Sequence, residues 1–260
     1  GVVEAIGEGV SEVAVGDRVA YAGLPPGAYA EVRIMPANRL VKLPESISTR
    51  QGAAMMLQGM TARYLLKGCY EVKAGDSILI HAAAGGVGLI ACQWAKHLGA
   101  TVIGTVGSPE KAELAQSHGC DHPVLYREED FVSRVKEITK GRGVDAVYDS
   151  IGETTFMKSL DCLRPMGMMV SFGQASGPIP PMDISILAAK GSLFLTRPSL
   201  MAYTAERQDL LAHAQDLFEV VERGAVKIEI HQTYSLAEAA QAHRDLEGRK
   251  TTGSAVLTIE

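Results

Sequence analysis

The stretch HAAAGGVGLIACQWAKHLGA, from His81 to Ala100, decides the fold. Small residues and a cluster of glycines follow the apolar run that begins at Ser77, and a long amphipathic helix follows them. The spacing Ala83-x-Gly85-x-x-Gly88 matches the strand-to-helix turn that binds the pyrophosphate of a dinucleotide, with alanine replacing the usual first glycine. Gly85 would let the backbone approach the pyrophosphate, and Gly88 would let the helix pack closely on the strand. The helix would also direct free N–H groups at the anion.

Short apolar strands alternate with helices after this turn. Further strands are expected in TVIGTVG, HPVLY, VDAVYDSIG, MGMMVSFG and GSLFLTRP, and helices in SPEKAELAQSHG, EEDFVSRVKEITKG and ETTFMKSLDCLRP. Strands that are apolar throughout are typical of burial on both faces of a sheet. The pattern predicts an α/β fold with a doubly wound, Rossmann-type parallel sheet.

The first 45 residues follow a different pattern. Strands are expected around Val2, Val3 and Ile6, between Val10 and Val15, and in GDRVAY, which indicates a small barrel or an open antiparallel sheet. The chain opens directly in strand-like sequence, so we expect it to lack its natural N-terminal part. A helix capped by Ser46 or Ser48 should follow, and the C-terminal part should hold helices near 205–223 and 236–246 and a closing strand in GSAVLTI.

Composition excludes several classes of protein. The 260 residues are 47% apolar and carry a net charge of −5, which argues against nucleic-acid and acidic-membrane partners. No apolar run reaches the roughly 18 residues that a membrane span needs. The four cysteines Cys69, Cys92, Cys120 and Cys162 are scattered, which argues against a disulfide framework or a cysteine metal site and fits a cytoplasmic location.

The second strand of the alternating region indicates which dinucleotide binds. An NAD site usually offers an acidic residue at the end of this strand, but residues 105–108 contain none. Ser108 can cap the next helix, and Lys111 lies in its first turn. Tyr126 and Arg127, after the third strand, could add a hydroxyl and a second cation. These groups suit the 2′-phosphate of NADPH and favour it over NAD; the alternative is that Lys111 is a solvated helix residue.

Eight segments together carry a family resemblance: GDRVAY, GAYAE, HAAAGGVGLIACQWAK, GTVGSPEKA, YREEDF, VYDSIG, SLDCLRPMGMMVSFG and GSLFLTRPSL. The chain resembles the zinc-free NADPH:quinone oxidoreductases, also called zeta-crystallin-like, of the medium-chain dehydrogenase/reductase superfamily. The resemblance implies a partial GroES-like catalytic β domain over residues 1–57, an NADP-binding Rossmann domain over 58–197, and a C-terminal segment, 198–260, that returns to complete the catalytic domain. The family's tyrosine and asparagine near the nicotinamide would lie in the missing N-terminal part, which puts the activity of this chain on its own in question.

The resemblance also implies a set of cofactor-binding residues, and the catalytic residues stay unassigned. Thr61 and Tyr64 would approach the nicotinamide and its ribose, although Thr61 could instead bond back to its helix and Tyr64 could be core. Backbone N–H groups of Gly86 and Val87 would meet the pyrophosphate. The remaining positions are Gly107, Ser108, Lys111 and Tyr126 around the adenosine ribose and 2′-phosphate; Ser150, Phe172, Gly173, Gln174 and Ala175 after the fourth and fifth strands; Arg197 and Pro198 beside the nicotinamide; and Arg249 at the adenosine end, unless Arg249 is a solvated loop charge.

No metal is expected. GDRVAYAGLPPGAYAEV has neither the cysteines nor the length of the zinc lobe found in alcohol dehydrogenases. Cys162 reads as a small buried hydrophobe and His81 as a hydrogen-bonded core residue.

The implied reaction is hydride transfer from NADPH to a quinone or a related electron-poor small molecule. The alternatives are an NADPH-dependent alkenal or enoyl reductase, a non-enzymatic NADPH-binding protein (crystallin-like or RNA-binding), and an inactive fragment. A homodimer is expected, because the sixth strand would otherwise leave its edge unpaired.

Overall fold

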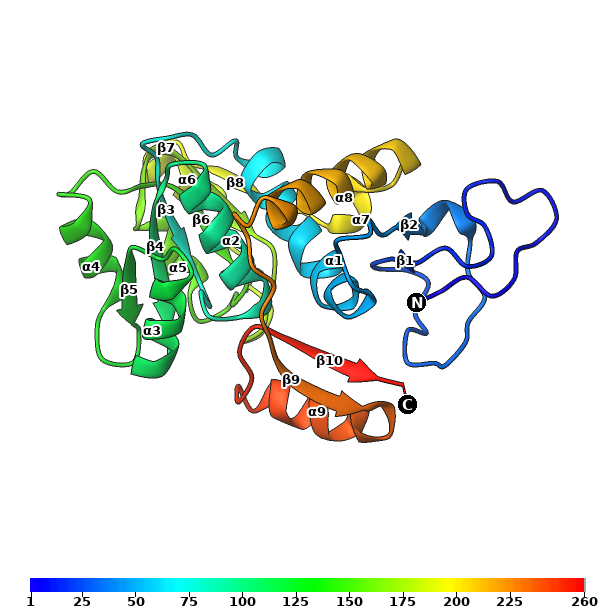
Figure 1. The fold of residues 1–260 in the computed structure, drawn as a ribbon. Coiled ribbons are helices and arrows are strands. Elements are labelled where there is room, and N and C mark those ends of the chain that lie inside the picture. Colours follow the sequence, from blue (N-terminus) through cyan, green and yellow to red (C-terminus); the bar gives the residue numbers. More distant parts are fainter. Residues whose placement is uncertain (260) are drawn as a thin grey trace. The chain divides into compact units, whose positions relative to one another are not determined.

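The computed structural model describes residues 1–259 and divides into two compact units (Figure 1). One unit comprises Tyr64–Ser199, and the other joins Gly1–Arg63 to the C-terminal segment from Leu200. The C-terminal segment therefore belongs to the same unit as the N-terminal residues. We describe each unit by itself.

The Tyr64–Ser199 unit is built on a parallel six-stranded sheet. Its strands lie in the order β5-β4-β3-β6-β7-β8, so the chain reverses its direction of winding beside β3. Their bounds are β3 (Ser77–Ile80), β4 (Thr101–Val106), β5 (His122–Leu125), β6 (Val144–Asp149), β7 (Leu163–Ser171) and β8 (Phe194–Thr196). All six predicted strands are present, and the expected doubly wound α/β sheet is confirmed.

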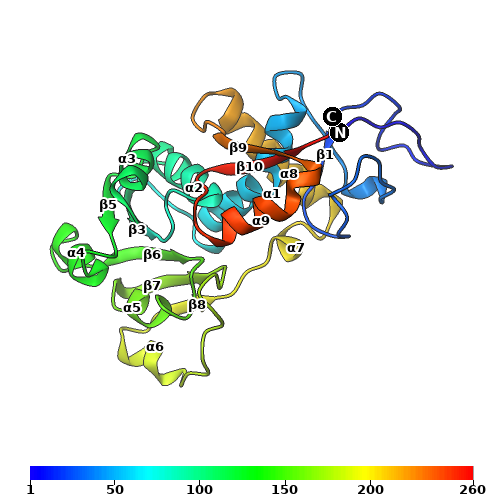
Figure 2. The same cartoon turned by 90° about the horizontal axis from the view of Figure 1, so that it is seen from below.

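Helices cover both faces of this sheet (Figure 2). On one side lie α2 (Gly86–His97) and α3 (Pro109–Ser117), and on the other lie α4 (Phe131–Ile138) and α5 (Phe156–Leu160). A short helix, α6 (Ser185–Ala189), precedes β8. Ser108 caps α3, as its sequence position predicts, and the structure adds a second cap, Asp130, which accepts the N–H of Ser133 at 3.1 Å at the start of α4.

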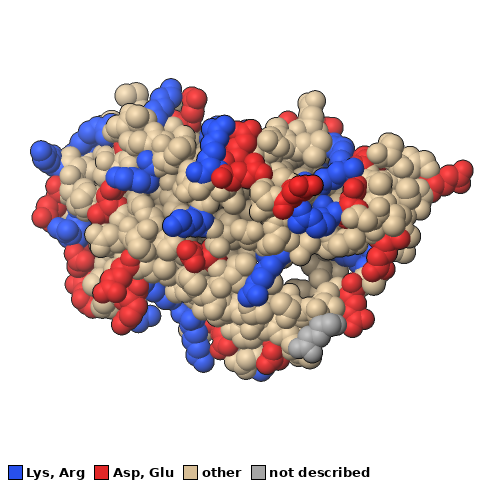
Figure 3. All heavy atoms as spheres, viewed as in Figure 1, with Lys and Arg blue, Asp and Glu red and all other residues tan. Residues whose placement is uncertain are grey.

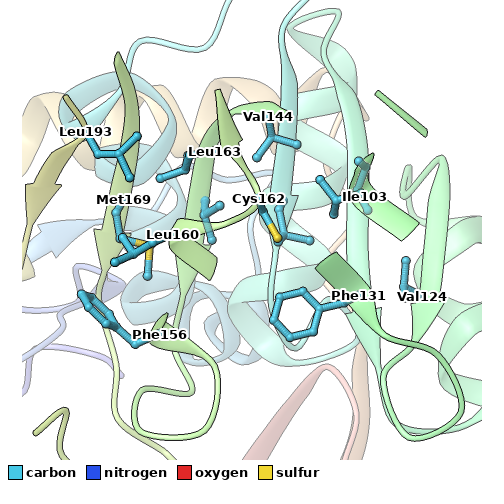
Figure 4. Packing of buried hydrophobic residues seen from close by; sticks show 13 residues of the cluster. Ile103, Val124, Phe131, Val144, Phe156, Leu160, Cys162, Leu163, Met169 and Leu193 are labelled. Carbon is cyan, nitrogen blue, oxygen red and sulfur yellow. The ribbon is translucent and has the colours of Figure 1, made fainter. Parts of the chain in front are cut away.

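One hydrophobic core lies on the side of the sheet that α4 and α5 cover (Figure 4). One row of this core crosses four adjacent strands, because Leu79 aligns with Ile103 and Val147, and Val147 aligns with Met169. Phe131 of α4 and residues of α5 pack against it. Burial of this row fixes the register of the strands, and the register decides which residues meet where the strands end.

The second unit contains longer helices and two small sheets. It holds β1 (Val19–Ala20) antiparallel to β2 (Val41–Lys42), and β9 (Ile230–Ser235) parallel to β10 (Ser254–Thr258). Its helices are α1 (Thr49–Tyr64), α7 (Leu200–Tyr203), α8 (Arg207–Glu222) and α9 (Ala239–Glu247). The last residue of α1, Tyr64, begins the other unit, where a π-helical turn (Leu65–Cys69) continues the helix. The hydroxyl of Ser254 donates to the carbonyl of Ala54 at 2.8 Å, which joins β10 to α1.

The predicted strands among the first 15 residues are wrong. Of the described residues around Val2, Val3 and Ile6, only Val2 forms a bridge, with Arg18, and no strand lies between Val10 and Val15. A strand needs hydrogen-bonded neighbours along its length, and a pattern of valines does not supply them. The prediction of a strand in GDRVAY is confirmed, because β1 lies there.

Within residues 1–259, no helix is both long enough and apolar enough to cross a bilayer. Acidic and basic side chains are interspersed over much of the face shown in Figure 3. That face therefore shows no broad field of a single sign.

Candidate dinucleotide-binding site

The turn between β3 and α2 leaves three backbone donors free. Gly85 is the N-cap of α2, and its own N–H donates to the carbonyl of Ala82 at 2.9 Å. In the described part of the chain, the next three N–H groups, of Gly86, Val87 and Gly88, have no acceptor. Three unpaired donors at the positive end of a helix form an anion-binding arrangement. The turn thus has the geometry that its sequence predicts.

Close backbone contacts require glycine at position 88. A Cβ atom there would lie 2.3 Å from the carbonyl oxygen of Ala82 and 2.6 Å from that of Ala83. Helix α2 therefore approaches the end of β3 as closely as the fingerprint predicts. Ala82 has a left-handed backbone, with φ of 54°, which is uncommon for a residue with a Cβ. Strain of this kind concentrates at binding sites.

The adenosine-side prediction brings together residues after β4 and β5. A Cβ atom at Gly107 would lie 3.1 Å from the hydroxyl oxygen of Tyr126, so the tyrosine ring lies directly over this glycine. The Ser108 hydroxyl accepts the N–H of Lys111 at 3.4 Å, which places Lys111 in the first turn of α3. The structure thus clusters all four residues that we predict around the adenosine ribose.

The same turn holds a carboxylate that is not among the predicted site residues. Glu110 lies in the first turn of α3, where a hydrogen bond from the Ser108 side chain lowers the pKa of its carboxyl group. Its position, two residues after the segment searched for an acid, would have been visible in the sequence. An ionised carboxylate here opposes a 2′-phosphate, whereas Lys111 favours one.

The residues predicted to bind the cofactor after the fourth and fifth strands lie in two loops that touch. A Cβ atom at Gly173 would lie 2.5 Å from the carbonyl oxygen of Ser150, and that oxygen accepts the N–H of Ala175 at 3.1 Å. The N–H of Phe172 donates to the carbonyl of Asp149 at 2.8 Å. The loops after β6 and β7 thus pack as one surface, on which Gln174 and Ala175 are exposed and Phe172 is half-buried.

Arg197 and Pro198 follow β8 at the same edge of the sheet. Pro198 is buried, whereas Arg197 is exposed and makes no ion pair or hydrogen bond with any residue from 1 to 259. A cation at the carboxyl end of a parallel sheet is available to an anionic ligand.

The other three predicted residues lie outside the loops at the carboxyl edge of the sheet, and Thr61 and Arg249 belong to the other unit. Thr61 and Tyr64 lie one turn apart near the end of α1, and both are buried. The Thr61 hydroxyl makes no hydrogen bond within the described residues, so it does not bond back to its helix. Arg249 follows α9 in the other unit, where its N–H donates to the carbonyl of Leu246 at 3.0 Å.

A buried polar layer beneath these loops was only partly predicted. His81 is buried and hydrogen-bonded to Thr105 and Ser159, as its sequence position predicts. Asp149, which is fully buried, was not predicted, although an acid at the end of the apolar run VDAVYD was a visible signal.

Two matches to family models cover most of the chain. A model described as zinc-binding dehydrogenase matches residues 86–215, and one described as alcohol dehydrogenase GroES-like domain matches residues 1–45. A quinone oxidoreductase from Pseudomonas aeruginosa is 52% identical over 257 residues, which make up 99% of this chain and 79% of that relative. This chain belongs to the quinone oxidoreductase family of the medium-chain dehydrogenase/reductase superfamily. The resemblance seen in the sequence is thereby confirmed.

Two further members of this family bear on cofactor and substrate. The crystal structure of Escherichia coli quinone oxidoreductase complexed with NADPH superimposes with a TM-score of 0.97 at 48% identity, covering 100% of this chain and 80% of that one. A 2-haloacrylate reductase from a Burkholderia species is 49% identical over 259 residues, 98% of this chain and 78% of the relative. The family therefore includes reductases with two kinds of substrate in their names.

The description of the matched family model mentions zinc, so we examined the metal-ligating side chains. Among residues 1–259, no three His, Cys, Asp or Glu side chains gather into a group that could hold a metal ion. Burial raises the pKa of the Cys162 thiol to about 12, and the thiol packs in the core beside α5. Cys162 therefore behaves as the small hydrophobe that the sequence indicates.

Proposed function

We propose that this chain binds NADPH at the carboxyl edge of its parallel sheet and uses it to reduce quinones. The observation that carries the proposal is the trio of free N–H groups at Gly86, Val87 and Gly88, directly after the first strand of the sheet. They would bind the pyrophosphate, as such groups do in other dinucleotide sites. The related E. coli enzyme, crystallised with NADPH, supports the choice of cofactor.

Preference for NADPH over NADH would come from the residues after β4. Ser108 and Lys111 offer a hydroxyl and a cation for the 2′-phosphate, and Tyr126 over Gly107 offers a second hydroxyl. Glu110 opposes the phosphate, so we expect its exposed side chain to turn toward solvent when the cofactor binds. Arg249, if it reaches this end of the cofactor, would add a second cation.

The bound cofactor supplies the hydride, and the chain supplies its placement. Ser150, Gly173 and Arg197 would hold the nicotinamide half, and Thr61, whose hydroxyl has no partner in the described chain, would approach it from α1. Correct placement of the two reactants can lower the barrier by about 7–11 kcal/mol at best. We propose a reaction without zinc, since burial holds the Cys162 thiol protonated and makes it a poor ligand for such a metal.

A second substrate class has a specific observation in its favour. A 2-haloacrylate reductase is nearly as similar to this chain as the quinone oxidoreductases are. Quinones and haloacrylates both present an electron-poor C=C bond conjugated to a carbonyl group, so one site could serve either.

We also propose a homodimer and a cytoplasmic location. Strand β8 is the last strand of the sheet, and its Phe194 and Leu195 are exposed. Pairing with a second copy would cover this edge. All four cysteines are free, as is usual in a reducing compartment.

Calorimetry and an activity assay test the proposal. We expect the chain to bind NADPH more tightly than NADH, and Lys111→Ala to remove most of that preference while Lys140→Ala, a loop variant distant in sequence, leaves it intact. NADPH oxidation should depend on added 1,4-benzoquinone, and a parallel assay with 2-chloroacrylate compares the second substrate class. Equal affinity for NADH and NADPH would contradict the cofactor proposal, and oxidation with 2-chloroacrylate alone would contradict the quinone proposal.

A further inference from the structure

A row of polar side chains crosses the sheet just before its carboxyl edge. Two residues beyond the apolar row of Leu79, Ile103, Val147 and Met169 lie His81, directly after β3, and Thr105, Asp149 and Ser171, on β4, β6 and β7. Side chains two positions apart on a strand share a face, so this polar row lies on the face that α4 and α5 cover. All four side chains are buried.

A chain of hydrogen bonds links three of these strands. Nδ1 of His81 lies 2.9 Å from the Thr105 hydroxyl, and Nε2 of His81 lies 2.9 Å from the Ser159 hydroxyl. Ser159 Oγ lies 3.4 Å from Oδ2 of Asp149. Burial lowers the pKa of His81, so the ring is neutral, with one nitrogen donating and the other accepting. The Ser171 hydroxyl has no hydrogen-bond partner in the described chain, so the network ends at Asp149.

Asp149 is the unusual member of this network. Its carboxylate is fully buried and forms no ion pair with any residue from 1 to 259. It instead accepts the N–H of Ile151 at 2.7 Å, the N–H of Gly152 at 3.0 Å and the Thr155 hydroxyl at 2.8 Å. A buried carboxylate is costly unless it is fully hydrogen-bonded, so its bonds determine the conformation of the turn at residues 150–152.

That turn supports the loop after β7. The carbonyl of Ser150 touches Gly173 and accepts the N–H of Ala175, and Gly152 pairs with Gly177. We propose that Asp149 is a positioning residue, which fixes the turn at residues 150–152 and through it the 172–175 loop that receives the nicotinamide half of the cofactor. Asp149 does not itself touch the cofactor. This inference rests on the proposed NADPH site.

The test compares two ligands on matched variants. NADPH probes the whole site, whereas adenosine 2′,5′-bisphosphate probes only the end near Lys111. Asp149→Ala should raise the Kd for NADPH about tenfold or more, because small displacements of a supporting shell have effects of this size. The Kd for adenosine 2′,5′-bisphosphate should stay within about twofold, as expected for a distant, independent site. Asp149→Asn keeps an acceptor oxygen for the N–H groups of Ile151 and Gly152 and should restore most of the NADPH affinity.

Asp145 provides a matched control. Asp145 lies on the same strand and the same face as Asp149, near the opposite end of β6. Its side chain is 2% exposed and forms ion pairs with Arg142 and Arg164. Asp145→Ala should lower the melting temperature and leave both ligand affinities unchanged. Should Asp149→Ala fail to fold by circular dichroism, Thr155→Val removes one donor, a hydroxyl that contacts both carboxylate oxygens. It should weaken the binding of NADPH alone by about threefold, as for one lost hydrogen-bond donor.

The possible outcomes distinguish failure of the role proposed for Asp149 from failure of the proposed NADPH site. If the unmodified chain binds neither ligand, the proposed NADPH site is wrong and the inference falls with it. If the unmodified chain binds both, the inference alone is overturned by any of three results: Asp149→Ala binds NADPH as the unmodified chain does, it loses both ligands equally, or Asp149→Asn is as impaired as Asp149→Ala.

Discussion

Ala83 and Gly104 show how one residue in a turn constrains its neighbour on the next strand. Ala83 stands where the dinucleotide fingerprint usually has glycine, and its methyl group is fully buried. A Cβ atom at Gly104 would lie 2.6 Å from the Cβ of Ala83 and 2.7 Å from the Sγ of Cys120. The extra methyl of the turn is therefore accommodated by a glycine in β4.

Gly104→Ala should destabilise the protein by about 1–3 kcal/mol, the usual effect of overpacking a core. Adding Ala83→Gly to that variant removes one of the two close contacts, so it should restore part of the loss. Urea unfolding of the two single variants and the double variant measures this as a coupling free energy. Strictly additive effects would show that the two positions do not constrain each other.

Asp145 predicts a pH dependence of stability. Burial alone would raise the pKa of its carboxyl group, but hydrogen bonds from Arg142 and Arg164 outweigh burial and lower the pKa below 3.8. A carboxyl whose pKa is lowered by folding stabilises the protein above its ordinary pKa and loses that contribution as the pH falls through the lowered value. The stability difference between the unmodified chain and Asp145→Asn should thus be constant from pH 7 to about 5 and shrink below about pH 4. Urea unfolding across this range provides the measurement, and a difference that widens in acid would refute the assignment.

Helix α1 has two candidate capping residues at its N-terminus. Two serines precede this helix, and the sequence alone did not choose between them. In the structure, the Ser48 hydroxyl accepts the N–H of Gln51 at 3.1 Å, and the Gln51 side chain accepts the N–H of Ser48 at 3.0 Å. This reciprocal pair is a capping box.

Ser48→Ala should therefore cost about 1 kcal/mol of unfolding free energy. Ser46→Ala is the control, because its exposed hydroxyl bonds only to Glu222 and caps no helix. Surface changes of this kind usually stay within about 0.5 kcal/mol. Thermal unfolding of both variants distinguishes the two serines, and equal losses would contradict the assignment of Ser48 as the cap.

Elements buried on both faces were the most predictable. Every strand of the parallel sheet lies where an apolar run predicts it. For the inner strands β4, β3 and β6, burial on both faces leaves a continuous signal in the sequence. The strands expected at Val3 and at Val10–Val15 are wrong, because pairing depends on a neighbouring strand that local sequence does not specify. Short apolar runs carry no information about such a neighbour.

Across the whole molecule, the candidate-site residues that can be predicted are those that belong to local sequence motifs. Gly85, Gly88 and Ser108 have the conformations that their motifs predict. Asp149 was missed because its role depends on Ser159 and His81, which come from other elements and meet only once the strands are in register. A contact between elements leaves no periodic signal in either of them.

The exposed edge of β8 predicts that the chain forms a homodimer through this strand. Phe194 and Leu195 are neighbours on this strand and so point to opposite faces, yet they are 57% and 39% exposed. An apolar edge strand exposed on both faces is a site for pairing with another chain.

We expect the unmodified chain to sediment as a dimer at micromolar concentration. Phe194→Glu should sediment as a monomer, because burying an unpaired carboxylate costs several kcal/mol. Met157→Glu, which alters a 43% exposed side chain on α5, is the control and should remain dimeric. A monomeric unmodified chain, or a dimer that survives Phe194→Glu, would show that β8 is not the interface.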